Sequence, residues 1–153
     1  MKKSLLELGI ILVFTFVFAF TFNFLWESFH AVYLYQNHNI EASLYIPMLV
    51  YVSTIDSLLI IGLYMFTGIV WRKILWIKEI ALYQWLLFTA SGILLAGLIE
   101  YRAVYISHRW AYMPYMPTLF GLGLSPLVQL SLTGLISIWL VKEILYGKGL
   151  LRK

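Results

Sequence analysis

The sequence predicts an all-α, polytopic membrane protein: a single domain, 1–153, in which four transmembrane helices form an antiparallel bundle with both termini in the cytoplasm. Two observations predict this class. Of the 153 residues, 62% are apolar and only 12% are charged, which is about half the charged fraction of a soluble domain. In addition, four apolar runs are long enough to cross about 30 Å of hydrocarbon, which takes about 20 residues of helix.

The first helix is predicted at 5–26. A short basic segment followed by an apolar run is also how a signal peptide begins. This run is longer than the roughly 7–15 apolar residues of a signal sequence, however, and no cleavage site with small residues follows it. We therefore expect a transmembrane helix that is retained in the mature chain.

The other three helices are predicted at 44–70, 80–101 and 119–141. They are separated by short segments, so consecutive helices should be antiparallel neighbours. No internal repeat and no second domain is evident along the chain.

Three local features refine these helices. Pro47 is expected in the first turn of the second helix, where its missing N–H costs little. Gly92 and Ala96 form a small-xxx-small pair that allows another helix to approach closely. Pro126 predicts a kinked start of the fourth helix, turned toward the bundle interior, because a proline leaves a carbonyl group of the preceding turn unpaired.

The basic residues predict the orientation. Arg102 and Arg109 fall between the third and fourth helices, and the other nine Lys and Arg residues flank the opposite helix ends. Basic residues are enriched on the cytoplasmic side of membrane proteins, so both termini should lie in the cytoplasm. Trp71, Trp76 and Trp85 would then lie at the cytoplasmic interface.

Charge and composition also exclude several functions. The net charge of +4 belongs to residues that flank apolar runs, so we expect no nucleic-acid partner. The chain has no cysteine, which excludes disulfides, thiol chemistry and cysteine metal sites.

One polar stretch interrupts the first helix near its outer end. Asn23, Trp26, Glu27 and His30 are spaced at i, i+3, i+4 and i+7, so they share one helix face. Ionisable residues in a membrane helix are costly and usually functional.

Further polar residues on the other helices are expected in the outer half of the membrane or just above it. Asp56 is expected near the middle of the membrane, and Glu100 and Gln129 in its outer half. We therefore predict a polar pocket in the outer half of the bundle. The candidate catalytic residues are Glu27, Asp56 and Glu100. The candidate ligand-binding residues are Asn23, Trp26, His30, Arg102, Arg109, Trp110, Tyr112 and Gln129.

Simpler roles for these groups remain open. Asp56 could form a structural buried hydrogen bond, and Arg102 or Arg109 could form an ion pair with Glu27 or Glu100 that ties two helices together. No metal-binding or cofactor motif occurs, so no metal and no cofactor is predicted. A hard cation such as magnesium or calcium at the three carboxylates is the alternative.

Three patches carry a resemblance to a known family: NFLWE at 23–27, RWAYMP at 109–114 and GLSPLVQ at 123–129. Together they resemble an uncharacterised family of small bacterial four-helix membrane proteins, over most of the chain. The Asn-x-x-Trp-Glu pattern is also similar to one in integral-membrane terpene cyclases, which have more helices. That similarity implies that Glu27 is an acid that protonates an isoprenoid, with Asp56 or Glu100 as the second carboxyl group.

These observations leave three hypotheses for the function. The first is a membrane enzyme that uses acid–base chemistry on a membrane lipid or isoprenoid, with Glu27 or Asp56 as the acid and Arg109 as an anchor for an anionic head group. The second is an ion or solute transporter or channel, formed as a homo-oligomer. The third is a lipid-binding or assembly subunit without chemistry.

Overall fold

A computed structural model of the chain describes residues 2–36 and 40–147. In this part of the chain, four long helices account for most of the structure: α1 (Lys2–Leu34), α2 (Ala42–Val70), α3 (Leu82–Tyr101) and α4 (Leu124–Lys142). All four are long and apolar enough to cross a membrane. The all-α class is therefore confirmed, and the helices support a multi-pass membrane protein.

Short elements complete the described fold. A 3-10 helix, η1 (Trp76–Lys78), lies between α2 and α3, and the π-helical turns η2 (Arg102–Ile106) and η3 (Glu143–Gly147) extend α3 and α4. A small antiparallel hairpin of β1 (Thr118–Leu119) and β2 (Leu122–Gly123) precedes α4, with Thr118 opposite Gly123. Its turn residues, Phe120 and Gly121, both have positive φ angles, as a two-residue hairpin turn of type I′ requires.

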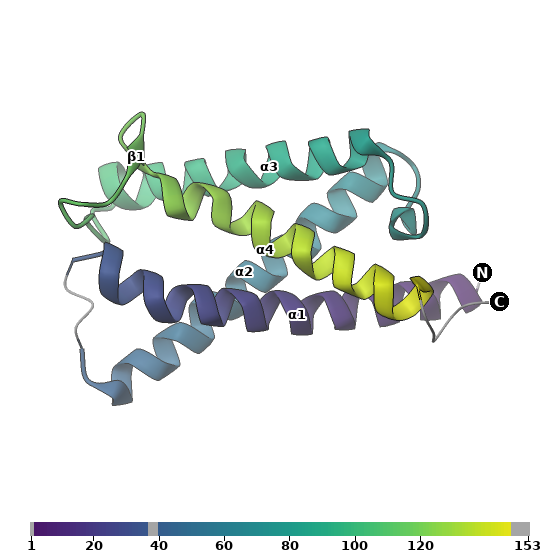
Figure 1. Cartoon of the computed structure of the whole chain (residues 1–153), viewed down its shortest axis with the longest axis horizontal. Helices are drawn as coiled ribbons and strands as arrows, with labels where there is room; N and C mark the ends of the chain where they lie inside the picture. Colours follow the sequence, from purple (N-terminus) through teal and green to yellow (C-terminus); the bar gives the residue numbers. More distant parts are fainter. Residues whose placement is uncertain (1, 37–39, 148–153) are drawn as a thin grey trace.

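The helices are arranged as two closely packed pairs. Helix α1 packs along α2, α3 packs along α4, and α1 and α4 join the two pairs. The beginning of α1 and the end of α4 lie at the same end of the molecule (Figure 1). Helices α2 and α3 are close together at that end and diverge toward the opposite end. The interior between the two pairs is therefore wider at the end far from the termini.

The narrow end is filled by large aromatic side chains. Trp76, Tyr64 and Phe88 are fully buried. The Trp76 indole donates a hydrogen bond to the Tyr64 carbonyl oxygen at 3.1 Å, and the Tyr64 hydroxyl donates to the Ile74 carbonyl oxygen at 2.9 Å. Trp76 was predicted at the membrane interface; its side chain is buried in the protein because the η1 segment turns the indole back into the core.

The helix ends differ from the predicted ones at two prolines. Helix α4 begins at Leu124 with Gly123 as its N-cap, so Pro126 lies in the first turn. The predicted cause of a kink is therefore absent, because a first-turn N–H has no helical partner to lose. Helix α2 begins at Ala42, so Pro47 lies inside the helix instead of in its first turn. Its missing N–H leaves the Ser43 carbonyl group without a helical partner.

Helix α1 also ends later than predicted, at Leu34. Two further turns of helix therefore follow Trp26, and Glu27 and His30 lie inside the helix instead of beyond its end. This extension carries the polar face of α1 up to the segment that connects α3 to α4.

A close approach between α3 and α4 occurs at Gly92. A Cβ atom at this position would lie 2.5 Å from Ser131 Oγ and 3.4 Å from the Ser131 backbone. Ser131 Oγ in turn donates a hydrogen bond to the Thr89 carbonyl oxygen at 2.9 Å. The close helix approach predicted from Gly92 and Ala96 is therefore confirmed, with α4 as the neighbour.

This packing predicts opposite effects of two Gly→Ala substitutions. Gly92→Ala should lower the free energy of unfolding by about 1–3 kcal/mol, because the added methyl group overpacks the α3–α4 contact. Gly62 has open space around it, so Gly62→Ala should raise the free energy of unfolding by about 0.5–1 kcal/mol through helix propensity. Thermal unfolding in a mild detergent measures both; equal shifts would contradict the close contact.

Candidate functional site

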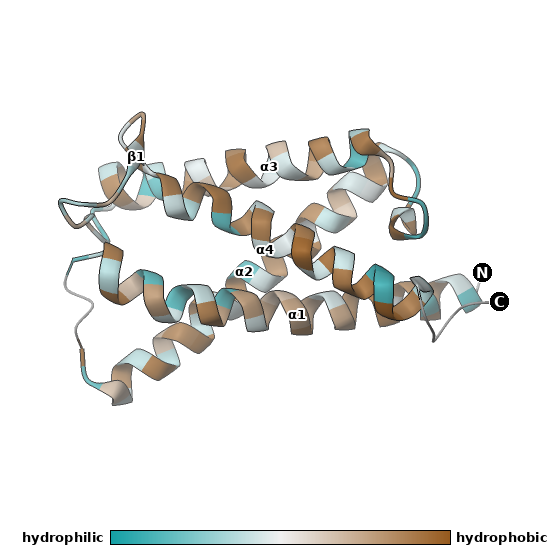
Figure 2. Ribbon diagram, viewed as in Figure 1, coloured by the Kyte–Doolittle hydropathy of each residue, from teal (hydrophilic) through white to brown (hydrophobic). Residues whose placement is uncertain are grey.

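The polar residues of all four helices meet at one cavity in the wide half of the molecule. The cavity has a volume of about 140 Å³. Each of its walls contributes a polar side chain: Glu27 from α1, Asp56 from α2, Glu100 from α3 and Gln129 from α4. Figure 2 shows hydrophilic positions interrupting the apolar surface of α1 in this half. The structure thus brings the three candidate catalytic residues to one cavity.

The side-chain amide of Gln129 joins three helices. Its Nε2 atom lies 2.7 Å from Glu27 Oε1, 3.1 Å from Asp56 Oδ2 and 3.1 Å from Asn23 Oδ1. An amide nitrogen carries two hydrogens, so these three acceptors share two donors. We call these four residues the Gln129 junction. It holds two carboxyl groups from different helices beside one another.

Two further hydrogen bonds orient the junction. Asn23 Nδ2 donates to the Ala19 carbonyl oxygen one turn earlier in α1, at 2.8 Å, which directs Asn23 Oδ1 toward Gln129. On α4, Thr133 Oγ1 donates to the Gln129 carbonyl oxygen at 2.8 Å and lies 3.3 Å from Asn23 Oδ1. Asn23 and Gln129 are both buried, so their side chains position the carboxyl groups from inside the fold.

A second group of hydrogen bonds surrounds Glu100, which is 4% exposed. Glu100 Oε1 accepts a hydrogen bond from the Tyr35 hydroxyl at 2.9 Å. Glu100 Oε2 accepts from the Tyr112 hydroxyl at 2.5 Å and from the Trp110 indole at 3.4 Å. We call these four residues the Glu100 clamp. They come from the end of α1, from α3 and from the segment after it.

The segment between α3 and α4 is attached to the end of α1 through its backbone. Gln36 N–H donates to the Ala111 carbonyl oxygen and Met113 N–H donates to the Leu34 carbonyl oxygen, each at 2.9 Å. Tyr35 and Tyr112 form the bridge between these two bonds. The segment therefore lies at the end of the cavity far from the termini and places Trp110 in its wall.

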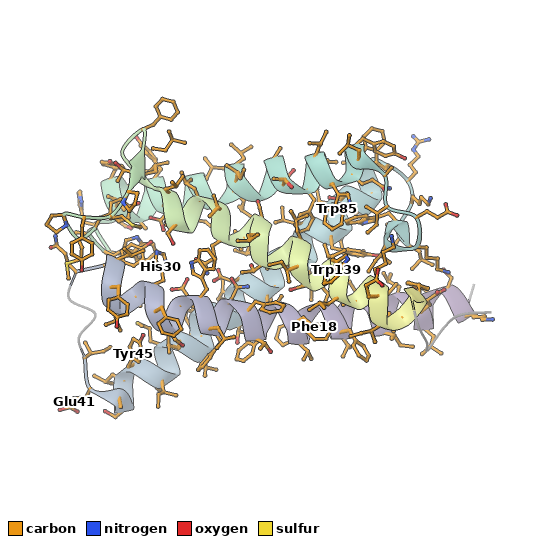
Figure 3. The ribbon with its side chains drawn as sticks, viewed as in Figure 1. Phe18, His30, Glu41, Tyr45, Trp85 and Trp139 are labelled. Atoms are coloured by element: carbon orange, nitrogen blue, oxygen red, sulfur yellow. The ribbon has the colours of Figure 1, made fainter. Side chains whose placement is uncertain are left out.

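His30 and Trp26 are not among the residues that line the cavity, although His30 lies beside the lining residue Glu27. His30, labelled in Figure 3, is 4% exposed, and its Nδ1 atom lies 3.7 Å from Glu27 Oε2. This distance is too long for a hydrogen bond. Neither ring nitrogen of His30 nor the Trp26 indole nitrogen has a hydrogen-bond partner in the part of the chain that the structure describes.

The two arginines are placed apart from the carboxyl groups. Arg102 and Arg109 are exposed, and neither forms an ion pair with an acidic residue within residues 2–36 and 40–147. The alternative in which an arginine ties Glu27 or Glu100 to another helix is therefore wrong for the described chain. Glu100 accepts bonds from hydroxyl and indole groups instead.

Sequence reasoning missed Tyr35, which lines the cavity and contacts Glu100. The signal for it was present, since Asn23, Glu27 and Ala31 follow one another at intervals of four residues along α1, and Tyr35 comes four residues later, directly after the helix end. Ending the predicted helix at 26 hid this continuation.

The described residues offer no metal site. No group of three or more His, Cys, Asp or Glu side chains among them could hold a metal ion. The three cavity carboxyl groups belong to two separate hydrogen-bond groups, so the alternative of a hard cation held by all of them has no geometric support. The arrangement is suited instead to exchanging protons or accepting hydrogen bonds from a ligand.

The Glu100 clamp predicts that Tyr112→Phe destabilises the protein. Removing the hydroxyl should lower the free energy of unfolding by about 1.5–3 kcal/mol, because the buried carboxyl group of Glu100 loses a hydrogen bond that the Tyr112 hydroxyl donates. Tyr115 is exposed in the same segment, so Tyr115→Phe should change stability by less than about 0.5 kcal/mol. Denaturant unfolding compares the two variants, and similar losses would contradict the clamp.

The same contact predicts a dependence of stability on alkaline pH. Burial, together with the hydrogen bond to Glu100, raises the pKa of Tyr112 above its usual value of 10.0. The folded protein keeps this proton at a pH where the unfolded chain has lost it, so stability falls as the pH rises above about 10. Melting temperatures at pH 9 to 11 should therefore fall more steeply for the wild type than for Tyr112→Phe, and parallel slopes would show that Tyr112 does not contribute.

Comparison with known protein-family models, with characterised proteins and with solved structures yields no match for this chain. The resemblance to small bacterial four-helix membrane proteins and the local similarity to terpene cyclases therefore stay predictions. The function must be argued from the geometry of the cavity.

Proposed function

We propose that this chain is an enzyme of the bacterial inner membrane that uses acid–base chemistry on a lipid or isoprenoid held in the cavity. The observation that carries the proposal is the Gln129 junction, which holds the Glu27 and Asp56 carboxyl groups side by side at the cavity wall. Glu100 faces the same cavity and is the candidate partner acid or base.

The orientation in the membrane follows from the basic residues. Arg72, Lys73 and Lys78 lie in the connection between α2 and α3, at the same end as the beginning of α1 and the end of α4. With this end in the cytoplasm, as the distribution of basic residues favours, the cavity lies in the outer half of the membrane. A lipid of the outer leaflet would then be near the cavity.

The carboxyl pair suits proton transfer. Two carboxyl groups held side by side at a cavity wall can take part in one proton transfer to or from a ligand, one group acting as acid and the other as base. Among the residues that the structure describes, no lysine or arginine lines the cavity beside the pair.

The remaining cavity wall suits an apolar substrate. Met48 and Val52 of α2 and Ile99 of α3 line one side. Tyr35 and Trp110 add aromatic surface, which stabilises a positive charge that develops near a ring face. An isoprenoid or another lipid that gains a proton would fit both the apolar wall and the aromatic rings.

Proton transport is the second candidate, and a specific observation favours it. Thr15, Thr67 and Gln84 are fully buried in the half of the molecule toward the termini. Each has a side-chain donor without a partner in the described chain. Such groups commonly bind internal water, and water there would extend a polar path from the Gln129 junction toward the cytoplasmic end.

Mass spectrometry of organic extracts tests the proposed function. The wild type, purified in a mild detergent, should retain a specific lipid or isoprenoid. In the Glu27→Gln/Asp56→Asn variant this compound should be lost or chemically different, because the proton donor and acceptor are removed. Glu41→Gln is the matched control, since Glu41 is an exposed carboxylate at the start of α2.

Two outcomes would count against the enzyme. The same bulk membrane lipids in all three samples would contradict a specific ligand. A compound retained unchanged by all three proteins would indicate a binding or assembly subunit in which the carboxyl pair performs no chemistry. In either case, proton flux into liposomes would next be measured for the wild type and the double variant.

A further inference from the structure

We propose that the cavity binds the positively charged ammonium head group of an amphiphile and discriminates against a phosphate head group. This inference rests on the proposed function and names the chemical class of its ligand. It is carried by the charges that line the cavity, by carboxylate oxygens that have no donor, and by the position of the apolar wall.

The charge of the cavity wall has one sign. Its ionisable side chains are Glu27, Asp56, Glu100 and the hydroxyl of Tyr35, and no lysine or arginine is among the lining residues. His30 is a basic residue beside the cavity wall, and its Nδ1 atom lies 3.7 Å from Glu27 Oε2. A phosphate head group would bring like charge against these carboxyl groups in a setting of low dielectric constant, whereas an ammonium group would neutralise them.

Arg109, the anchor expected for an anionic head group, does not add a positive charge to the cavity wall. Arg109 is exposed and does not line the cavity. The predicted role of Arg109 in holding a phosphate or carboxylate at this site therefore lacks support.

The hydrogen-bond balance also favours a donor-rich ligand. Gln129 supplies two hydrogens to three acceptor atoms. Asp56 Oδ1 and Glu27 Oε2 accept no hydrogen bond from a residue that the structure describes. A primary ammonium group carries three N–H donors and no acceptor, so it complements these oxygens, whereas a phosphate would add further acceptors.

Aromatic rings complete the wall around the head group. Tyr35 and Trp110 line the cavity, and their ring centroids lie 5.7 Å apart in an edge-to-face arrangement. Aromatic faces attract an ammonium group through the ring quadrupole. Both rings are held in place by their hydrogen bonds to Glu100.

The apolar side of the cavity indicates where the alkyl tail of the ligand would lie. Ile99, a lining residue of α3, is 37% exposed, so the cavity wall continues to the outer surface of the helices there. Helices α2 and α3 diverge toward this end of the molecule (Figure 1). The ammonium group would therefore lie among the carboxyl groups, and the alkyl tail would extend past Met48, Val52 and Ile99 toward the lipid.

A series of amphiphiles that differ only in the head group tests this inference. Protein in a nonionic detergent is titrated with dodecylammonium, dodecanol or dodecyl phosphate while its tryptophan fluorescence is recorded. The wild type should bind dodecylammonium at least about tenfold more tightly than dodecanol, and dodecyl phosphate most weakly, because complementary charge is worth this much at a partly buried site. Ethylammonium, which lacks the tail, should bind more weakly than dodecylammonium.

Variants separate binding at the cavity from effects on the micelle. Glu41→Gln should keep the preference for ammonium, and Glu27→Gln/Asp56→Asn should lose it. Charge effects on the micelle are the same for all three proteins. If the double variant does not fold, as judged by its helical circular dichroism, Asp56→Asn alone is compared and should weaken dodecylammonium binding several-fold.

Each other result has a definite meaning. Equal affinity for the three head groups, or a preference for phosphate, would overturn the assignment and leave the proposed acid–base site intact. If ethylammonium binds as tightly as dodecylammonium, the proposal that the ligand is an amphiphile with an alkyl tail would be wrong. Absence of any binding would overturn this inference alone if a specific lipid copurifies with the protein, and would overturn the proposed function as well if none does.

Discussion

The contact on which the wide half of this structure depends is the one made by the Gln129 amide. A single nitrogen atom lies within 3.1 Å of acceptors on α1 and α2. Two carboxyl groups in an apolar bundle repel one another and lose the solvation that water would supply. The amide supplies part of that solvation from α4, and it does so only if α1, α2 and α4 keep their present positions. Helix packing and the cavity are therefore coupled through this residue.

The Glu100 clamp applies a similar constraint at the outer end. Three donors from α1 and from the segment after α3 converge on one buried carboxyl group, which attaches that segment over the cavity. At the opposite end, the interior is closed by aromatic packing around Trp76 and Tyr64. The molecule thus combines a tightly packed end, where α2 and α3 meet, with a polar end where they diverge. The cavity lies at the polar end, and the three carboxyl groups line it.

Much of the candidate site could be predicted from the sequence, because membrane helices have a regular geometry. Rise per residue and helix periodicity placed Glu27 and Glu100 at the outer ends of their predicted helices and Asp56 and Gln129 deeper along theirs. All four line the cavity. Tyr35 was missed because the predicted first helix ended too early. Arg109 was expected to be near the carboxyl groups, but depth alone does not say which direction a loop residue faces, and its side chain is exposed.

The sequence by itself determined the all-α class and the number of helices long and apolar enough to cross a membrane, because an apolar helix satisfies its own backbone hydrogen bonds whatever its neighbours do. It also determined which polar residues share a helix face. Only the tertiary structure decided which carboxyl groups are adjacent, which donor serves each of them and that no arginine of the described residues reaches them. Those pairings depend on how helices rotate and cross, and this is set by packing between residues far apart in the chain, such as Gly92 against Ser131 and Gln129 against Glu27.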